Sequence, residues 1–169
     1  MEQVLVIGSP GAGKSTLATE LAARTGLPLF HLDRLHWKPG WVESEAAEFD
    51  ALLLDVIAQP RWIIDGNYGR TLLLRLDRAD TVIDLDLPAW LCLARAIGRV
   101  ARSHGQVRPD MGPECPEHFN LSFLAYIANF PRAGRRRIET RLRSFEGDVI
   151  RLRNRREVRR FLDDVATRG

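Results

Sequence analysis

Short apolar runs alternate along the chain with longer segments whose apolar residues recur at helical spacing. Five of the runs have the length and composition of buried strands, at residues 3–7, 28–32, 61–65, 81–86 and 148–152. The other segments predict helices near residues 14–25, 44–59, 71–76, 88–103, 121–130, 132–143 and 157–166. Strands that alternate with helices are typical of βαβ units, so the pattern predicts an α/β fold with a parallel sheet.

Small and polar residues mark several of the expected helix ends. Gly26 follows the first helix as a C-terminal stop, and Pro88 fits the first turn of a later one. Ser44 is the expected N-cap of the second helix, which Pro60 closes.

Two segments do not follow the alternation. Residues 33–42 are polar and aromatic, and too irregular to predict either a helix or a strand. Residues 104–118 are rich in Gly and Pro with little apolar content, which predicts a mobile loop that forms a lid rather than a core element. Since no repeat or linker divides the chain, we expect residues 1–169 to form one domain with the lid as an insertion.

Length and composition narrow the class of protein. The 169 residues are 45% hydrophobic and 28% charged, which is ordinary for one globular domain. No apolar run reaches the roughly 18–20 residues that a membrane span requires, so we expect no membrane association. The first strand begins at once, which leaves no room for a signal peptide. Cys92 and Cys115 have no metal-binding spacing, so a cytoplasmic location without a disulfide is expected.

Charge is distributed unevenly along the chain. Residues 1–94 carry 8 basic and 13 acidic groups, a balance of −5, whereas residues 95–169 carry 17 and 9, a balance of +8. Nearly all the basic residues are arginines, which suit bidentate contacts to phosphate. The excess is consistent with binding of a triphosphate or of nucleic acid, and equally with arginines on solvated helix faces.

The loop after the first strand has the pattern G-x-x-x-x-G-K-[ST], between a buried strand and a helix, as a phosphate-binding loop (P-loop, Walker A) requires. Backbone N–H groups of such a loop and the N-terminus of the following helix bind phosphate oxygens. Lys14 can reach the β- and γ-phosphates, and Ser15 can ligate Mg²⁺. The residues predicted to bind the nucleotide here are Gly8, Ser9, Pro10, Gly11, Ala12, Gly13, Lys14, Ser15 and Thr16.

A second motif follows the third strand. Asp65 ends this run, where it could hold a Mg²⁺-bound water beside the phosphate loop, and Arg70 could contact an acceptor. The segment 65–71 resembles the D-G-F-P-R-T motif of adenylate kinase and related nucleoside monophosphate kinases, with one extra residue before the arginine. That resemblance implies roles for Asp65 in metal and acceptor binding and for Arg70 in acceptor binding.

The resemblance extends to the helix after the fourth strand. Arg95 and Arg99 match the arginines that, in those kinases, lie at the hinge of the lid and contact the base and phosphates. Their i, i+4 spacing independently places them on one helix face, which Arg102 extends. The resemblance therefore implies that Arg95 and Arg99 take part in catalysis and that Arg95 also binds ATP.

The run H-L-D-x-L-x-W-x-P-G-W at residues 31–41, the segment 65–68 and the segment 108–116 resemble the DNA topology modulation proteins of bacteria, which are adenylate-kinase-like P-loop proteins. The similarity spans almost the whole chain. It implies a three-layer α/β sandwich whose five-stranded parallel sheet has the order 2-3-1-4-5, with a short helical lid.

Several residues at the carboxyl ends of the second and third strands are candidates for the acceptor site. Asp33 could bind or deprotonate an acceptor hydroxyl, as a carboxylate base can, or cap a helix. Aromatic rings could form a wall for the acceptor or pack beneath the loop. The acceptor residues predicted are Asp33, His36, Trp37, Asp65, Asn67, Tyr68 and Arg70, with Trp41 as a further aromatic candidate and His31 as a structural residue.

Residues in the last third of the chain complete the predicted site. Arg132 is predicted to be catalytic through contact with the γ-phosphate, with Arg135 and Arg136 as alternatives on the same helix. Asn154 and its neighbours follow the fifth strand, where related kinases enclose adenine with backbone contacts. Because the N-K-x-D signature of GTPases is absent, ATP is expected rather than GTP.

The sequence as a whole predicts an ATP- and Mg²⁺-dependent phosphotransferase that acts on a small, unidentified acceptor. Two alternatives stay open. One is a nucleotide-dependent regulatory or DNA-associated protein, which the arginine-rich second part favours although no base-reading element is visible. The other is a plain NTPase that turns over without an acceptor.

Overall fold

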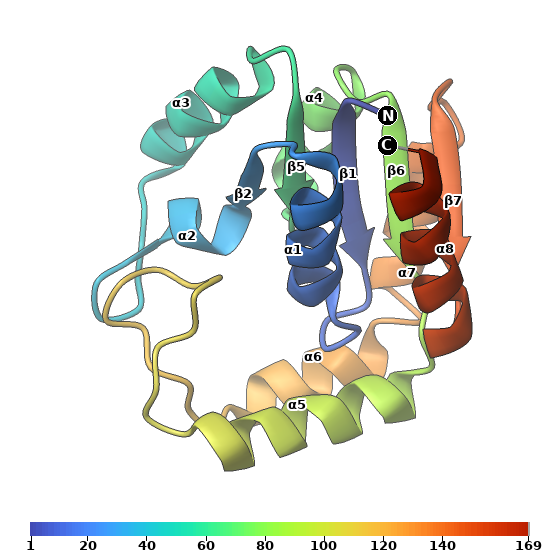
Figure 1. The fold of residues 1–169 in the computed structure, drawn as a ribbon. Helices are drawn as coiled ribbons and strands as arrows, with labels where there is room; N and C mark the ends of the chain where they lie inside the picture. The colour runs from blue at the N-terminus through green and yellow to red at the C-terminus, as the bar shows by residue number, and fades with distance from the viewer. Residues whose placement is uncertain (169) are drawn as a thin grey trace.

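A computed structural model describes residues 1–168 and has a parallel sheet of five strands at its centre (Figure 1). The strands are β1 (Gln3–Gly8), β2 (Leu29–His31), β5 (Trp62–Asp65), β6 (Thr81–Leu85) and β7 (Asp148–Leu152). Their order is β2-β5-β1-β6-β7, and every neighbouring pair is parallel. Numbered by chain order within this sheet, that is 2-3-1-4-5, as predicted.

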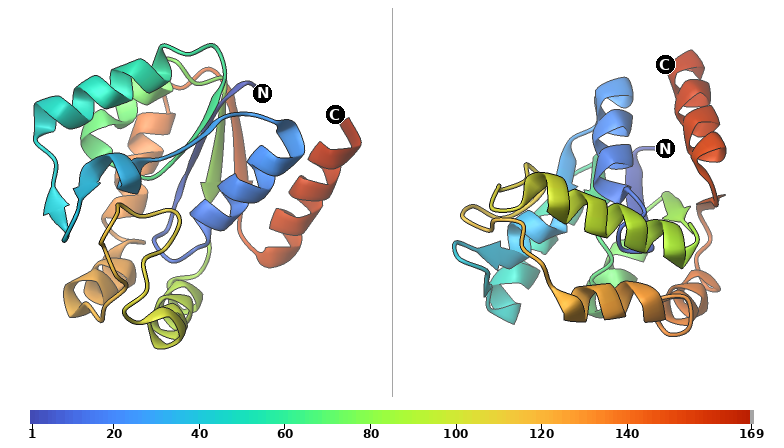
Figure 2. Two further views of the ribbon diagram at one scale, coloured as in Figure 1. Left: turned by 60° about the vertical axis from the view of Figure 1, so that its left-hand side comes forward. Right: turned by 90° about the horizontal axis from the view of Figure 1, so that it is seen from below.

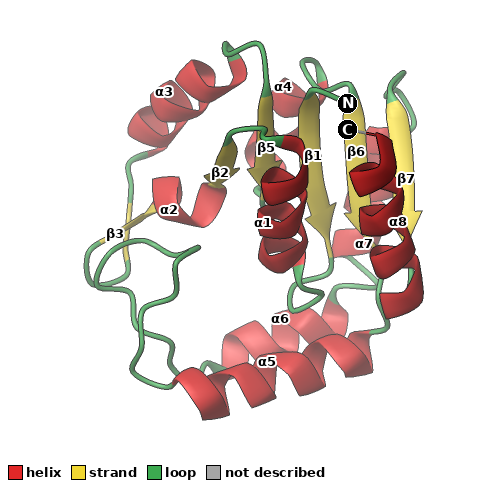
Figure 3. Ribbon diagram, viewed as in Figure 1, coloured by secondary structure: helices red, strands yellow, loops and turns green. Residues whose placement is uncertain are grey.

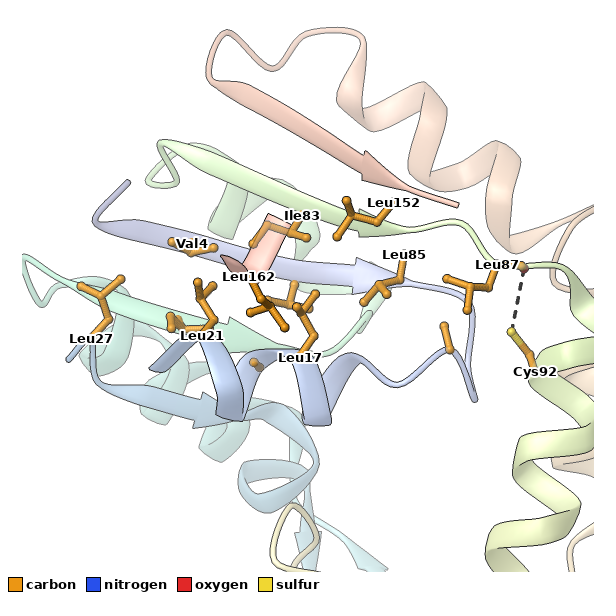
Figure 4. Packing of buried hydrophobic residues seen from close by; sticks show 14 of the residues in the cluster. Val4, Leu17, Leu21, Leu27, Ile83, Leu85, Leu87, Cys92, Leu152 and Leu162 are labelled. Atoms are coloured by element: carbon orange, nitrogen blue, oxygen red, sulfur yellow. Dashed lines mark hydrogen bonds between the residues drawn. The ribbon is translucent and has the colours of Figure 1, made fainter. Parts of the chain in front are cut away.

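Helices cover both faces of the sheet because the side chains of β1 alternate between them. Val4 and Val6 pack with α1 (Lys14–Thr25) and α8 (Arg155–Arg168). Figure 4 shows Leu17, Leu21 and Leu162 from these helices beside Val4 and Ile83. Leu5 and Ile7 pack on the opposite side with α3 (Ala46–Ile57), α4 (Leu72–Leu76) and α7 (Gly134–Leu142). The result is the predicted three-layer α/β sandwich.

Two further helices lie beyond the carboxyl ends of the strands. Helix α5 (Ala89–Ser103) and helix α6 (Leu121–Asn129) pack against each other there (Figures 1 and 2). Residues 104–118, which we call the lid, connect them. Within residues 1–168, no helix is both long enough and apolar enough to cross a bilayer.

The segment after β2 is more regular than its sequence predicts. It contains the short helix α2 (Leu32–His36) and a hairpin of β3 (Trp37–Lys38) and β4 (Val42–Glu43), drawn in Figure 3. The expectation that residues 33–42 form neither element was therefore wrong. Elements this short have little intrinsic stability, so tertiary contacts rather than local propensity form them.

Ser44 has a different role from the one predicted. Helix α3 begins at Ala46 with no side-chain cap, and the Ser44 hydroxyl donates to the carbonyl oxygens of Leu35 and His36, at 3.1 and 2.8 Å. Ser44 thus ties the end of the hairpin to α2. The 3₁₀ turn η1 (Gly69–Thr71) completes the set of elements, directly before α4.

Residues 104–118 form a loop, as their composition predicts. The helical lid that the family resemblance implies was wrong, because only the flanking helices α5 and α6 are helical. Isolated bridges join the two arms of the lid, between His104 and Glu117 and between Val107 and Pro116. Three of its side chains, Met111, Cys115 and Glu117, are nevertheless buried. The lid therefore packs on the body of the protein despite its Gly- and Pro-rich composition.

Candidate functional site

The P-loop connects β1 to α1 and depends on glycine at three positions. Gly8, Gly11 and Gly13 have φ values of 129°, 78° and 96°, where side chains are strongly disfavoured. A Cβ on Gly8 would lie 2.3 Å from the carbonyl oxygen of Leu85, and one on Gly11 2.6 Å from that of Cys92. The loop can adopt its shape only because these residues lack side chains.

Lys14 begins α1 and reaches back over the loop. Its Nζ donates to the carbonyl oxygens of Gly8 and Ser9, at 3.4 and 3.2 Å. Burial lowers the pKa of Lys14, whereas the nearby carboxylates of Asp65 and Asp33 oppose that shift. Both predicted carboxylates therefore lie within electrostatic reach of the P-loop lysine.

Asp65 lies at the carboxyl end of β5, in register with Val6 of β1. It is 5% exposed, and its Oδ2 lies 3.0 Å from Nδ1 of His31. Its other oxygen, Oδ1, is buried with no hydrogen-bond partner in the protein. A buried carboxylate oxygen without a partner is costly, so this atom fits contact with a water molecule of a Mg²⁺ ion.

The metal site would be completed by the nucleotide rather than preformed. Within residues 1–168, no group of three His, Cys, Asp or Glu side chains could hold a metal. Mg²⁺ keeps several waters and commonly binds through one or two protein ligands and substrate phosphates. Ser15, in the first turn of α1, and Asp65 are suited to such a site.

Asn67 contacts the P-loop and not an open acceptor space. Its Nδ2 donates to the carbonyl oxygen of Gly8 at 2.9 Å, and its Oδ1 accepts from the N–H of Gly8 at 3.0 Å. Because both ends of the amide are used, the geometry gives Asn67 the role of positioning the P-loop. This differs from the predicted contact with the acceptor.

Asp33 and Tyr68 form a hydrogen-bonded pair on the acceptor side. The Tyr68 hydroxyl donates to Oδ1 of Asp33 at 2.6 Å. Burial raises the pKa of Asp33, the Tyr68 hydrogen bond lowers it, Asp65 raises it, and Lys14 and Arg108 lower it. Burial beside Asp33 also raises the pKa of Tyr68, which keeps the phenol protonated as a donor.

A buried arginine that sequence reasoning missed holds the loop before Tyr68 in shape. Arg75 is fully buried and donates to the carbonyl oxygens of Gly66, Asn67 and Tyr68 at 2.9, 2.7 and 3.0 Å. Burial lowers the pKa of Arg75 to about 9. Nothing in its Leu-rich surroundings distinguishes Arg75 from a surface residue, so the sequence carried no signal for it.

Tyr68 needs this support because its backbone is strained. Its φ is +26°, in the region that non-glycine residues rarely adopt. The contacts of Arg75 with three successive carbonyls over-determine the turn, so the Tyr68 ring is held beside Asp33.

The predicted aromatic residues lie close together, and they pack mainly against one another's rings. The His36 ring contacts the rings of Trp37, Phe49 and Tyr68, with centroids 4.9, 5.5 and 4.9 Å apart. The Trp37 ring in turn lies 5.3 Å from that of Trp41. These residues form an aromatic cluster that braces the hairpin and Tyr68, so packing accounts for much of their arrangement.

Arg95 and Arg99 both face the P-loop side of α5. Arg95 donates to the carbonyl oxygen of Ala12 at 2.7 Å. Burial lowers the pKa of Arg95, and the charge of Arg155 adds to the effect. Arg99 contacts Glu117 of the lid at 3.1 Å, and its charge contributes to the lowered pKa of Lys14.

The remaining predicted arginines do not join this group. Arg102 is exposed and turns back against Gly98 of its own helix. Arg70 is exposed on η1, where it forms a two-point pair with Asp50 at 2.6 and 2.7 Å. Arg132 and Arg136 are exposed as well, and contact of either with the γ-phosphate stays a prediction.

Arg135 is engaged by carboxylates and is not directed at the P-loop. It is 7% exposed and donates to both oxygens of Asp84, at 2.9 and 2.6 Å. It also lies 3.3 Å from Asp86 and from Glu139. This ion-pair group joins β6 to α7, so the interpretation of Arg135 as a phosphate ligand was wrong.

Asn154 lies directly before α8, where its side chain has a structural task. Its Oδ1 accepts from the N–H of Glu157 at 3.0 Å, and its Nδ2 donates to the Glu157 carboxylate at 2.6 Å. This is the reciprocal arrangement of a helix N-terminus. The backbone role predicted for this segment around adenine stays a prediction.

Two lid residues were not assigned from the sequence. Arg108 contacts Asp110 at 3.2 Å and Glu117 at 2.9 Å, and its charge lowers the pKa of Asp33. Glu117 is 7% exposed and contacts both Arg99 and Arg108. Arg108 belongs to the R-P-D-M run that carries the family resemblance, and that run was the available signal.

Comparison with known proteins supports this fold. A family model described as "ATPase family associated with various cellular activities (AAA)" matches residues 4–64, from β1 into β5. An adenylate kinase from Symbiobacterium thermophilum is 33% identical over 135 residues, covering 60% of this chain and 61% of that protein. The chain thus spans about three fifths of the length of the curated relative it matches.

Solved structures agree on the architecture. A shikimate kinase from Acinetobacter baumannii, solved in complex with shikimate, has a TM-score of 0.59 at 17% identity and covers 98% of this chain and 90% of that one. A gluconokinase from Sinorhizobium meliloti has a TM-score of 0.53 at 16% identity, covering 99% and 94%. The chain therefore has the fold of P-loop kinases. The DNA topology modulation family and a nucleic-acid partner both stay predictions.

Proposed function

We propose that this protein is an ATP-dependent phosphotransferase that transfers the γ-phosphate of ATP to a hydroxyl group of a small acceptor. The observation that carries the proposal is the position of Asp65 at the carboxyl end of β5, next to the P-loop strand, with the charges of Asp65, Asp33 and Arg99 all acting on the pKa of Lys14. The P-loop and Lys14 form what we call the phosphate-binding side of the site. Asp33, hydrogen-bonded to Tyr68, belongs to what we call the acceptor side.

The phosphate-binding side would hold the triphosphate. Backbone N–H groups of the P-loop and the N-terminus of α1 face it, and Lys14 would leave its carbonyl partners for the β- and γ-phosphates. Ser15 and, through water, Asp65 would hold Mg²⁺. When bound, that ion neutralises charge on the phosphate oxygens.

The acceptor side would supply a base. Oδ1 of Asp33 accepts the Tyr68 hydrogen bond, which leaves Oδ2 for the acceptor hydroxyl. In the transfer, the acceptor oxygen forms a bond to the γ-phosphorus while the bond to the ADP oxygen breaks. Asp33 takes the hydroxyl proton. A carboxylate base is useful for an alcohol and superfluous for an acceptor that is already a phosphate, which favours an alcohol.

The test is acceptor-dependent release of ADP from Mg-ATP, screened over sugars, hydroxy acids, nucleosides and other small alcohols. Asp33→Asn is expected to lower the turnover of a hit by about 10²–10⁴-fold with little change in nucleotide affinity. Asp55→Asn, which removes an exposed carboxylate of α3, is the matched control. Turnover that needs no acceptor but requires Lys14 would instead identify a plain NTPase.

The same variant gives a check on folding. Burial raises the pKa of Asp33 in the folded state, so ionising it opposes folding as the pH rises through that pKa. Asp33→Asn is therefore expected to melt at a higher temperature than the wild type at pH 7, with the difference shrinking toward pH 3. Loss of activity together with gain of stability is the signature of a functional carboxylate rather than a structural one.

A further inference from the structure

Glu117 is the point at which the two sides of the site meet. Its Oε1 lies 3.1 Å from both Nε and Nη2 of Arg99, and its Oε2 lies 2.9 Å from Nε of Arg108. Each carboxylate oxygen therefore contacts a different arginine: Oε1 accepts a hydrogen bond from Arg99, and Oε2 forms an ion pair with Arg108 whose Nε makes no hydrogen bond. The side chain is 8% exposed, so water screens these contacts only weakly.

The two arginines act on opposite sides of the site. Arg99 comes from α5, and its charge is felt at Lys14 on the phosphate-binding side. Arg108 comes from the lid, and its charge is felt at Asp33 on the acceptor side. Glu117 is the side chain that contacts both, so it links the surroundings of Lys14 to those of Asp33.

The backbone around Glu117 makes this link stiff. Its N–H donates to the carbonyl oxygen of Gln106 at 2.8 Å, and its carbonyl oxygen accepts from the N–H of Gly105 at 2.9 Å. The two arms of the lid are thus joined at the residue that carries the carboxylate.

The lid is in turn fixed to the hairpin of the acceptor side. The carbonyl oxygen of Glu114 accepts from the N–H of Gly40 at 3.1 Å, and that of Pro116 accepts from Nε1 of Trp41 at 3.2 Å. A Cβ on Gly112 would lie 2.0 Å from the carbonyl oxygen of Trp37, so the two backbones touch there. The lid and the hairpin are therefore in direct backbone contact.

We propose that Glu117 is a positioning residue that couples nucleotide binding to the ordering of the acceptor side, by holding Arg99 and Arg108 on one carboxylate. This inference rests on the proposed function, because it takes the P-loop as a nucleotide site. Nucleotide phosphates that engage Arg99 would, through Glu117, fix Arg108 and the hairpin beside Asp33. The competing role is a brake, in which Glu117 withholds the two arginines from phosphate.

Amide hydrogen exchange with Mg²⁺ and AMP-PNP separates these roles without a known acceptor. In the wild type, the nucleotide is expected to slow exchange at residues 8–16, in the lid and at residues 37–43. In Glu117→Gln, protection of residues 8–16 persists, whereas that of residues 37–43 falls to the level without nucleotide. Loss of Arg99 orientation is expected to weaken AMP-PNP affinity by about tenfold.

A matched control and a second variant keep the test sharp. Glu114→Gln makes the same chemical change at an exposed carboxylate of the same lid and is expected to behave as the wild type. If Glu117→Gln fails to fold by circular dichroism, Glu117→Asp keeps the charge. Its shorter side chain cannot reach both arginines, so it should also lose the coupling.

The outcomes are distinct. Unchanged protection of residues 37–43 in the Glu117 variants overturns the coupling, as does its absence in the wild type. Tighter nucleotide binding by Glu117→Gln overturns it in favour of the brake. Absence of protection at residues 8–16 in the wild type would instead refute the nucleotide site and the proposed function with it.

Discussion

The phosphate-binding side and the acceptor side of this site are built in different ways. The first is one continuous segment, residues 8–16, whose shape follows from its glycines and from the start of α1. The second joins α2, the turn at residues 66–68, the hairpin and the lid, and Tyr68 lies 35 residues from Asp33 in the chain. A local segment can be recognised from its sequence, whereas a site assembled from distant segments depends on how they pack.

Removing Lys14 from the phosphate-binding side should have the largest effect on turnover. Lys14→Ala is expected to lower acceptor-dependent turnover by about 10³-fold, because the charge that stabilises the transferred phosphoryl group is lost. Steady-state release of ADP measures it. The only other lysine, Lys38, pairs with Glu48 on the surface, so Lys38→Ala should leave turnover within twofold of the wild type.

Asn67 belongs to the turn at residues 66–68 on the acceptor side, and its side chain binds Gly8 of the P-loop. Its substitution therefore tests whether the turn contributes to nucleotide binding. Asn67→Ala leaves the N–H and carbonyl of Gly8 without their partners, at a cost of about 1–3 kcal/mol. We expect AMP-PNP affinity measured by calorimetry to fall by about tenfold, with Asn129→Ala, an exposed amide on α6, as the control. If nucleotide affinity is unchanged and acceptor binding is weakened, Asn67 binds the acceptor, as the sequence predicted, and does not position the P-loop.

A smaller effect is expected from removing one hydroxyl of the acceptor side. Tyr68→Phe keeps the ring contacts but removes the hydrogen bond that lowers the pKa of Asp33. That pKa should therefore rise further, and the acid limb of the kcat/KM profile should move to higher pH. The profile of Thr140→Val, which removes an exposed hydroxyl of α7, should keep the wild-type position. A shift to lower pH, or none, would contradict the assignment of Asp33 as the base.

The smallest effect on activity is expected for Arg70, which contacts neither the phosphate-binding side nor the acceptor side. Arg70 is exposed and engaged with Asp50, so Arg70→Ala should not change turnover or acceptor affinity measurably. The same assays apply, with Arg78→Ala, another exposed arginine, as the reference. A tenfold loss confined to acceptor affinity would restore the role that the adenylate kinase resemblance implies.

Most of the architecture could be predicted because buried strands carry strong local signals. The runs at residues 81–86 and 148–152 agree with β6 and β7 to within one residue. The helix α2 and its hairpin could not be predicted, since Ser44 and the aromatic cluster stabilise them through contacts with other elements. Short elements of this kind have no periodicity long enough to detect.

The candidate site was predictable to different depths. Asp33 and Asp65 could be located near the P-loop because the carboxyl ends of parallel strands share one edge. The fate of single polar side chains could not be foreseen. Nothing in the sequence distinguishes Arg135, buried on Asp84, from Arg136, exposed one residue later.

By itself, the sequence determined the α/β class, the strands and the phosphate-binding loop, because each depends on neighbouring residues and their backbone preferences. Only the tertiary structure decided which polar groups are used up and which remain for chemistry. It assigned Asn67 to Gly8, and it brought Glu117 to Arg99 and Arg108. The reason is physical: a hydrogen bond or ion pair between distant residues forms only after packing has placed their elements, and local spacing does not encode that placement.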